Sequence, residues 1–239
     1  MQNKIQSLLF SLPLALFTAT PASAINIVTY NLAGTTGSQL TQGSASSATN
    51  ITGLDITRGA GLSTATGAGS FASSGFEGTV AAPTSDEYVQ LGFTVNPGFT
   101  VSLDNLKIGT RSSATGPSTM RLFYSLDGFV SATSVGSTIT QPSTLATVLS
   151  TIDLSSLTGL TNTVTFRFYE DGNTQADTIG ATDINGTFRL SNFDTNGIVF
   201  DGTVATAVPF EFAPEFGLVA VGAWVSRKWI VKKIQEFKK

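Results

Sequence analysis

The amino-acid sequence predicts an all-β fold: an antiparallel two-sheet β-sandwich, jelly-roll-like in topology, between an N-terminal signal helix and a C-terminal transmembrane helix. Composition is the first reason, because Ser and Thr supply 61 of the 239 residues, 17 residues are Phe and 24 are Gly. Thr and Phe favour strands, whereas Gly favours turns. The second reason is that apolar residues in the middle of the chain recur at every second position, the period of a strand with one buried face.

The clearest strand signals lie on either side of Asn96-Pro97-Gly98. Apolar residues alternate with polar residues or Gly over Val89–Val95 and again over Phe99–Leu103. This pattern predicts a hairpin with one apolar face and one Thr/Ser face. The alternation changes phase after Leu103, so we expect a β-bulge or corner at Asp104-Asn105.

Further strands are predicted wherever short apolar or alternating runs lie between turn residues. The strong candidates are Met120–Tyr124, Val164–Phe168 and Thr187–Leu190, and the weaker ones are Ile27–Leu32, Leu54–Thr57, Thr147–Leu154 and Ile198–Val204. Eight or more such strands are typical of a sandwich. Residues 34–78 are rich in Gly, Ser, Ala and Thr and predict long loops or weak edge strands.

The N-terminus has the pattern of a secretory signal peptide. Lys4 precedes the ten-residue apolar run Leu8–Phe17, and Ala22-Ser23-Ala24 supplies the small residues that signal peptidase requires. We therefore expect cleavage after Ala24, which makes Ile25 the first residue of the exported protein. The apolar run is too short to span a bilayer stably.

The C-terminus combines an apolar segment with a basic end. A helix from Pro214 to Val231 has 18 residues and a length of about 27 Å, close to the roughly 30 Å of a hydrocarbon core. The basic residues place the C-terminus in the cytoplasm. A shorter span followed by an amphipathic segment on the inner leaflet remains an alternative. The residues that would stop and orient the helix are Arg227, Lys228, Lys232 and Lys233.

This tail resembles the PEP-CTERM sorting signals of bacteria that make exopolysaccharide, specifically the PFE-CTERM variant associated with cyanobacteria. The resemblance rests on Pro209, Phe210 and Glu211, followed by the Gly/Leu/Ala/Val helix and the basic end. It implies recognition by exosortase, a membrane-embedded cysteine protease of transpeptidase type, and delivery to the cell surface or extracellular matrix. The chain then divides into a signal peptide (1–24), a β-sandwich ectodomain (25–207) and a sorting signal (208–239).

A looser resemblance covers part of the ectodomain. Gly116-Pro117-Ser118, the run Tyr124–Phe129 and the run Gly186–Asn192 are similar to segments of secreted PEP-CTERM β-sandwich domains. This resemblance implies a fold and no particular activity.

Charge and missing residue types exclude several functions. Residues 25–207 hold six basic and 13 acidic residues, a formal charge of −7, which disfavours nucleic-acid binding by the ectodomain. The chain has no His and no Cys, so it lacks the ligands of ordinary zinc, copper, haem and iron–sulfur sites and the residues of Ser-His-Asp or Cys-His catalysis.

Calcium is the one cofactor that the acidic residues favour. Four oxygen-bearing side chains fall within 14 positions of one expected loop, although their spacing is not that of an EF-hand. These residues are Glu170, Asp171, Asp177 and Asp183. An acidic solvated loop explains the same residues without a metal.

The remaining side chains favour a binding or structural role. Carbohydrate binding needs exposed aromatic rings beside amide and carboxylate groups, but most Phe positions follow the buried phase and both Trp lie in the tail. The outward strand phase holds Arg121, Arg167 and Arg189, which would form a polar ridge or ordinary surface salt bridges.

Two functions from different classes follow. The first is a non-enzymatic surface or matrix protein, sorted by exosortase and associated with exopolysaccharide. The second is a secreted carbohydrate-active enzyme that depends on Asp and Glu alone, for which two carboxylates across a cleft would be needed. Because most ectodomain Asp residues are explained by turns, we expect no catalytic residue and no enzyme.

Overall fold

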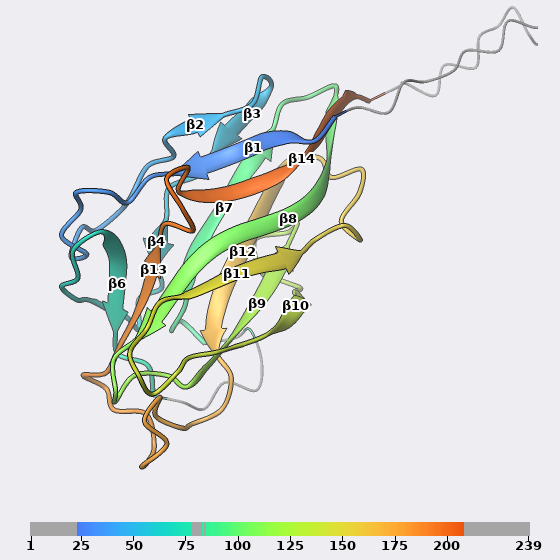
Figure 1. Ribbon diagram of the computed structural model, residues 1–239. Helices are drawn as coiled ribbons and strands as arrows, with labels where there is room; N and C mark the ends of the chain where they lie inside the picture. The colour runs from blue at the N-terminus through green and yellow to red at the C-terminus, as the bar shows by residue number, and fades with distance from the viewer. Residues whose placement is uncertain (1–22, 78–82, 84, 208–239) are drawn as a thin grey trace, which may run out of the picture.

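The computed structural model describes residues 23–77, 83 and 85–207, and these residues form a sandwich of two antiparallel sheets. The eight-stranded sheet contains β1 (Ile25–Tyr30), β2 (Ser46–Ser47), β5 (Ser63–Thr64), β6 (Ser70–Ser74), β8 (Phe99–Ser112), β11 (Val148–Asp153), β13 (Thr187–Ser191) and β14 (Ile198–Thr206). The six-stranded sheet contains β3 (Ile51–Gly53), β4 (Thr57–Arg58), β7 (Val89–Val95), β9 (Thr119–Ser125), β10 (Thr133–Thr140) and β12 (Thr163–Glu170). Figure 1 shows the first sheet in front of the second.

Strand β8 organises the eight-stranded sheet. It pairs with β14 and then with β13 along its length, and β11 also pairs with it. In the other sheet the order is β10-β9-β12-β7-β3. Most neighbours in both sheets are distant in sequence, so the register of each sheet depends on long-range pairing.

The core lies between the two sheets and is built around aromatic rings. The Phe200 ring from β14 lies 4.9 Å from that of Phe166 and 5.8 Å from that of Phe93, both in the opposite sheet. Phe188 from β13 similarly contacts Phe168 of β12 at 6.2 Å. All five rings are fully buried, so these pairs join the two sheets along the length of the sandwich.

The predicted hairpin around Asn96-Pro97-Gly98 is wrong. β7 belongs to the six-stranded sheet and β8 to the eight-stranded sheet, so the turn carries the chain from one sheet to the other. Gly98 has a φ of +83°, the left-handed conformation that this Pro-Gly turn requires. The alternation is the same in both arrangements, because the apolar faces of two strands can lie side by side in one sheet or face each other across a core.

Most other predicted strands are confirmed. Those at 120–124, 147–154, 164–168, 187–190 and 198–204 correspond to β9, β11, β12, β13 and β14. The predicted bulge is also present, since Leu103 pairs with Gly202 and Asn105 with Asp201, which leaves Asp104 without a partner in the ladder. The sequence patterns did not predict β6 and β10. β6 is the run SFASS, in which four consecutive residues are buried and no alternation exists, and in β10 Ser, Thr and Gly separate the two buried residues.

The predicted strand Leu54–Thr57 falls on an interruption between β3 and β4. Tyr30 fills this interruption from the opposite sheet. Its one hydroxyl hydrogen is shared between the carbonyl oxygens of Leu54 and Gly92, at 2.8 and 2.7 Å, and its oxygen accepts from the amide nitrogen of Gly92 at 3.2 Å. A side chain therefore supplies hydrogen bonds that a paired strand would otherwise make. Burial raises the pKa of Tyr30 above its ordinary value, so the hydroxyl stays protonated.

The start of β1 and the end of β14 lie at the same end of the sandwich (Figure 1), where Ile25 pairs with Gly202. Ala24 and Ile25, which flank the predicted signal cleavage point, are exposed, whereas Ala22 lies outside the described residues. The predicted sorting motif, transmembrane helix and basic tail at 208–239 also lie outside them. Within residues 23–77, 83 and 85–207, no helix is long and apolar enough to cross a membrane.

Candidate functional site

The outer face of the six-stranded sheet carries a cluster of aromatic rings around an arginine. In β12, Phe166 and Phe168 point into the core, so Arg167 and Tyr169 point outward by the two-residue period of a strand. The pairing of β12 with β7 and β9 places further outward residues beside them. We call this cluster the aromatic–arginine face; it consists of Tyr88, Gln90, Phe123, Phe129, Arg167 and Tyr169.

Arg167 is held between two rings. Its guanidinium carbon lies 3.7 Å from the ring centroid of Tyr88 and 3.9 Å from that of Phe129. Its Nε donates to Gln90 Oε1 at 2.8 Å. Cation–π contacts of this kind contribute about 0.5–2 kcal/mol each, so the charge, the amide and both rings have defined positions.

Tyr169 lies beneath the cluster and is fully buried. Its ring contacts Tyr88 and Phe123 at centroid distances of 5.7 Å, and its hydroxyl donates to the carbonyl oxygen of Pro83 at 3.3 Å. Burial raises the pKa of Tyr169, with Arg167 acting in the opposite direction. The hydroxyl is therefore a donor at neutral pH. The half-exposed rings of Tyr88 and Phe123 pack against this buried side chain, which holds them in position.

A tight loop brings Phe129 over the sheet. Asp127 accepts hydrogen bonds from the amide and hydroxyl of Ser131 and from the hydroxyl of Ser125. These bonds lower the pKa of Asp127 to about 2, so the loop keeps its charged acceptor until the pH falls toward that value. Phe129 has a φ of +69°, a conformation that is unusual for a bulky residue and is often found at functional sites.

A polar group borders the cluster. Arg121 Nη2 lies 2.8 Å from Asp171 Oδ2, and Thr138 Oγ1 donates to the same oxygen at 3.0 Å. The Arg121 side chain is 43% exposed and that of Asp171 is 28% exposed. The outer sheet face thus combines aromatic, amide, guanidinium and carboxylate groups within a few neighbouring strands.

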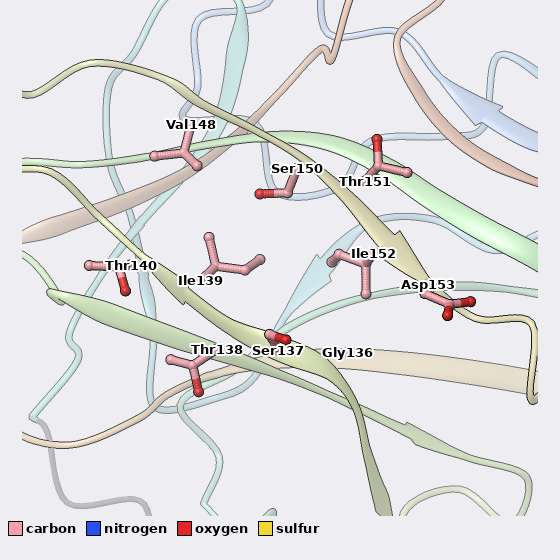
Figure 2. Close-up of a pocket in the computed structure, with 10 residues that line it drawn as sticks. All are labelled: Gly136, Ser137, Thr138, Ile139, Thr140, Val148, Ser150, Thr151, Ile152 and Asp153. Atoms are coloured by element: carbon pink, nitrogen blue, oxygen red, sulfur yellow. The ribbon is translucent and has the colours of Figure 1, made fainter.

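A separate groove of about 400 Å³ lies between β10 and β11, one strand from each sheet. Figure 2 shows Val148, Ser150 and Ile152 pointing toward Ile139 across this gap. Asp153 is the one carboxylate among the residues that line the groove. A glycosidase needs two carboxylates, so this groove does not supply the residues for that reaction.

The four predicted calcium ligands take part in separate local interactions. Thr182 Oγ1 donates to Glu170 Oε1, whereas Asp171 pairs with Arg121. Asp177 and Asp183 each accept a hydrogen bond from a backbone amide two residues later. In the part of the chain that the structure describes, no three acidic side chains are grouped to hold a metal ion. Calcium binding stays a prediction from the sequence.

Of the two alternatives for the outward arginines, the ridge of three is wrong, whereas a surface salt bridge is confirmed for Arg121, which pairs with Asp171. Arg121 and Arg167 share the outer face of the six-stranded sheet, but Arg189 lies in β13 of the other sheet. Strand phase correctly indicates that a side chain points outward. It does not indicate which sheet the strand joins, because that depends on pairing with distant segments.

The sequence pattern predicts that most Phe residues are buried in the core. Phe123 and Phe129 are exceptions, because both are half-exposed on the outer face. A signal for Phe123 was present, since it shares the strand phase of Arg121, whereas Leu122 has the buried phase. Phe129 follows the last residue of β9 by four positions and lies in a loop, where period-two alternation carries no information.

Comparison with known proteins finds no matching family model and no matching curated protein. Among solved structures, the chain is similar to a mutant of a family 29 carbohydrate-binding module, with 13% identity, a TM-score of 0.39, and coverage of 75% of this chain and 92% of that one. A second mutant of a family 29 module has 12% identity, a TM-score of 0.39, and coverage of 75% and 87%. At these values the similarity assigns no ligand to this chain.

Proposed function

We propose that this chain is an exported, non-enzymatic surface or matrix protein whose β-sandwich binds extracellular polysaccharide on the aromatic–arginine face. The export and sorting steps rest on the sequence patterns at 1–24 and 208–239. In this proposal signal peptidase removes the first segment, exosortase processes the second, and the ectodomain reaches the cell surface or matrix without binding nucleic acid.

The observation that carries the binding proposal is the composition of one outer sheet face. Half-exposed Tyr88, Phe123 and Phe129 lie beside Gln90 and Arg167. Sugar rings present apolar C–H surfaces that pack against aromatic side chains, and their hydroxyls accept from guanidinium and amide donors. Because these side chains already contact one another, the surface is pre-organised and little conformational entropy is lost on binding.

The simpler explanation is that the cluster only fastens two loops to the sheet. The two explanations differ in what a ring-removing substitution changes. Phe129→Gly tests this directly, because Gly adopts a positive φ without strain while the ring is lost. The variant can adopt the same loop conformation without strain, so its binding behaviour reports on the ring.

Phe129→Gly is expected to weaken retention of the ectodomain by a binding polysaccharide about tenfold, the equivalent of about 1.4 kcal/mol. The measurement is affinity electrophoresis against a panel of neutral and acidic extracellular polysaccharides, with product analysis by chromatography. Leu149→Ala is the matched control, since Leu149 is exposed on the other sheet. Equal retention of the Gly variant and the parent protein, or release of oligosaccharide, would contradict the proposal.

Export and sorting have their own test. Intact-mass analysis of envelope or secreted material, from a host with a working exosortase, is expected to show Ile25 as the first residue and loss of the segment after about Pro209. An Ala24→Leu variant should retain the N-terminal segment, because signal peptidase requires small residues there. Recovery of the complete C-terminal tail would overturn the sorting proposal.

A further inference from the structure

Two arginines lie side by side on the outer face of the eight-stranded sheet. Arg111 of β8 and Arg189 of β13 are directly opposite each other in the antiparallel ladder. Their strand neighbours Thr110, Phe188 and Leu190 are buried, so both arginines project away from the core. Like charges directly opposite each other on a sheet destabilise it.

The charge of this pair is not balanced by nearby acidic groups. The ion pairs among the described residues are Lys107–Asp201 and Arg121–Asp171, and neither includes Arg111 or Arg189. Burial, followed by repulsion from Arg111, lowers the pKa of Arg189. Residues 25–207 hold 13 acidic residues, and the two that form ion pairs among the described residues, Asp171 and Asp201, pair with other basic side chains.

Arg189 also lines an open groove of about 770 Å³. The backbone of Gly67 packs against its stem so closely that a Cβ added at Gly67 would lie 3.0 Å from Arg189 Cδ and Nε. The hydroxyl residues Thr35, Thr36 and Thr66 line the same groove. Gly67 therefore sets the direction in which the guanidinium leaves the sheet.

Several polar atoms around Arg189 are buried without a hydrogen-bond partner among the described residues. They are Arg189 Nε itself and, on the same strand and in the same outward phase, Thr187 Oγ1 and Ser191 Oγ. These three atoms are closed to solvent, so a ligand would contact the outer guanidinium nitrogens of the two arginines. A ligand that supplies negatively charged oxygen atoms there would balance the positive charge of the pair.

We propose that Arg111 and Arg189 form an anion-binding site for the carboxylate or sulfate ester groups of an acidic polysaccharide. Both groups match the planar, multi-donor guanidinium, which can bind two oxygens at once. That a polysaccharide carries the anion rests on the proposed function; the anion site itself does not.

The test measures binding of sulfated dextran, polygalacturonate and uncharged dextran to the ectodomain at low ionic strength. We expect both charged polymers to bind and Arg111→Gln and Arg189→Gln each to weaken binding about tenfold. Lys107→Gln is the matched control. Lys107 lies on the same strand and face as Arg111 and carries an equal charge, but that charge already pairs with Asp201. Arg111→Lys should bind more tightly than Arg111→Gln and less tightly than the parent protein. Lysine keeps the positive charge but lacks the planar guanidinium that binds two oxygens at once.

A second readout separates this site from a structural role. Without ligand, Arg111→Gln should raise the Tm, because it removes repulsion between like charges. Millimolar inorganic sulfate should then raise the Tm of the parent protein more than that of Arg111→Gln. A fall in the Tm of the ligand-free variant, or an equal response to sulfate, would overturn the proposal.

The same experiment distinguishes this site from the aromatic–arginine face. Loss of acidic-polymer binding in Phe129→Gly but not in the two Arg→Gln variants would overturn the anion site and leave the proposed function standing. Loss in the Arg→Gln variants alone would support the anion site and count against the aromatic–arginine face as the place where such polymers bind. Binding of uncharged dextran as tight as that of sulfated dextran would also overturn the anion site.

Discussion

Arg58→Met is expected to lower the free energy of unfolding by about 3–5 kcal/mol, because it removes several hydrogen bonds from a partly buried charged group that joins three segments of the chain. The Arg58 guanidinium donates to the carbonyl oxygens of Ala72, Gly37 and Gln39 and to Ser73 Oγ. Its carbon also lies 3.8 Å from the ring centroid of Phe71. One side chain thus ties the loop at residues 37–39 and strand β6 to β4.

The measurement is urea denaturation followed by tyrosine fluorescence and far-ultraviolet circular dichroism. Burial lowers the pKa of Arg58 to about 10, so it remains a cation at neutral pH and the comparison is made there. Arg121→Gln is the matched control: Arg121 forms an exposed ion pair, and such pairs contribute about 0–1 kcal/mol. A loss below about 1 kcal/mol in Arg58→Met would show that these hydrogen bonds do not hold the loop.

Phe200→Ala is expected to cost about 3–5 kcal/mol, the range for removing a buried aromatic ring from a packed core. Phe200 is fully buried and contacts Phe93 and Phe166 of the opposite sheet. Its removal leaves a cavity where the two sheets meet, and the surrounding strands can close it only by changing their register or spacing.

The same denaturation experiment measures this loss. Phe200→Leu keeps most of the apolar volume and should cost less than half as much. Val130→Ala serves as the surface control, since Val130 is 90% exposed and its truncation should change stability by less than about 0.5 kcal/mol. Similar losses for Phe200→Ala and Phe200→Leu would show that ring packing between the sheets is not the main contribution.

The strand positions were predictable because burial and alternation are properties of local sequence. β7, β9, β12 and β13 each alternate a core residue with an outward residue, and all four were predicted. β10 was missed because its run Thr133–Thr140 contains only two buried apolar residues, Val135 and Ile139, on either side of a register shift.

Less of the candidate sites could be predicted. Arg167 was correctly assigned an outward phase, but the rings of Tyr88 and Phe129 that hold it come from a segment before β7 and a loop after β9. The pairing of Arg111 with Arg189 requires β13 to lie beside β8. No local pattern encodes either contact, because each depends on which distant strand supplies the neighbouring hydrogen bonds.

The sequence by itself determined that the described part of the chain is all-β, where most strands lie, which of their side chains point outward, and that Asp104 interrupts the alternation. It also supplies the patterns at both ends on which the export proposal rests. Only the tertiary structure decided that β7 and β8 lie in different sheets and that Arg189 lies beside Arg111 and not beside Arg121. The physical reason is that alternation specifies a buried face, whereas the choice of partner strand is settled by packing and pairing over the whole chain.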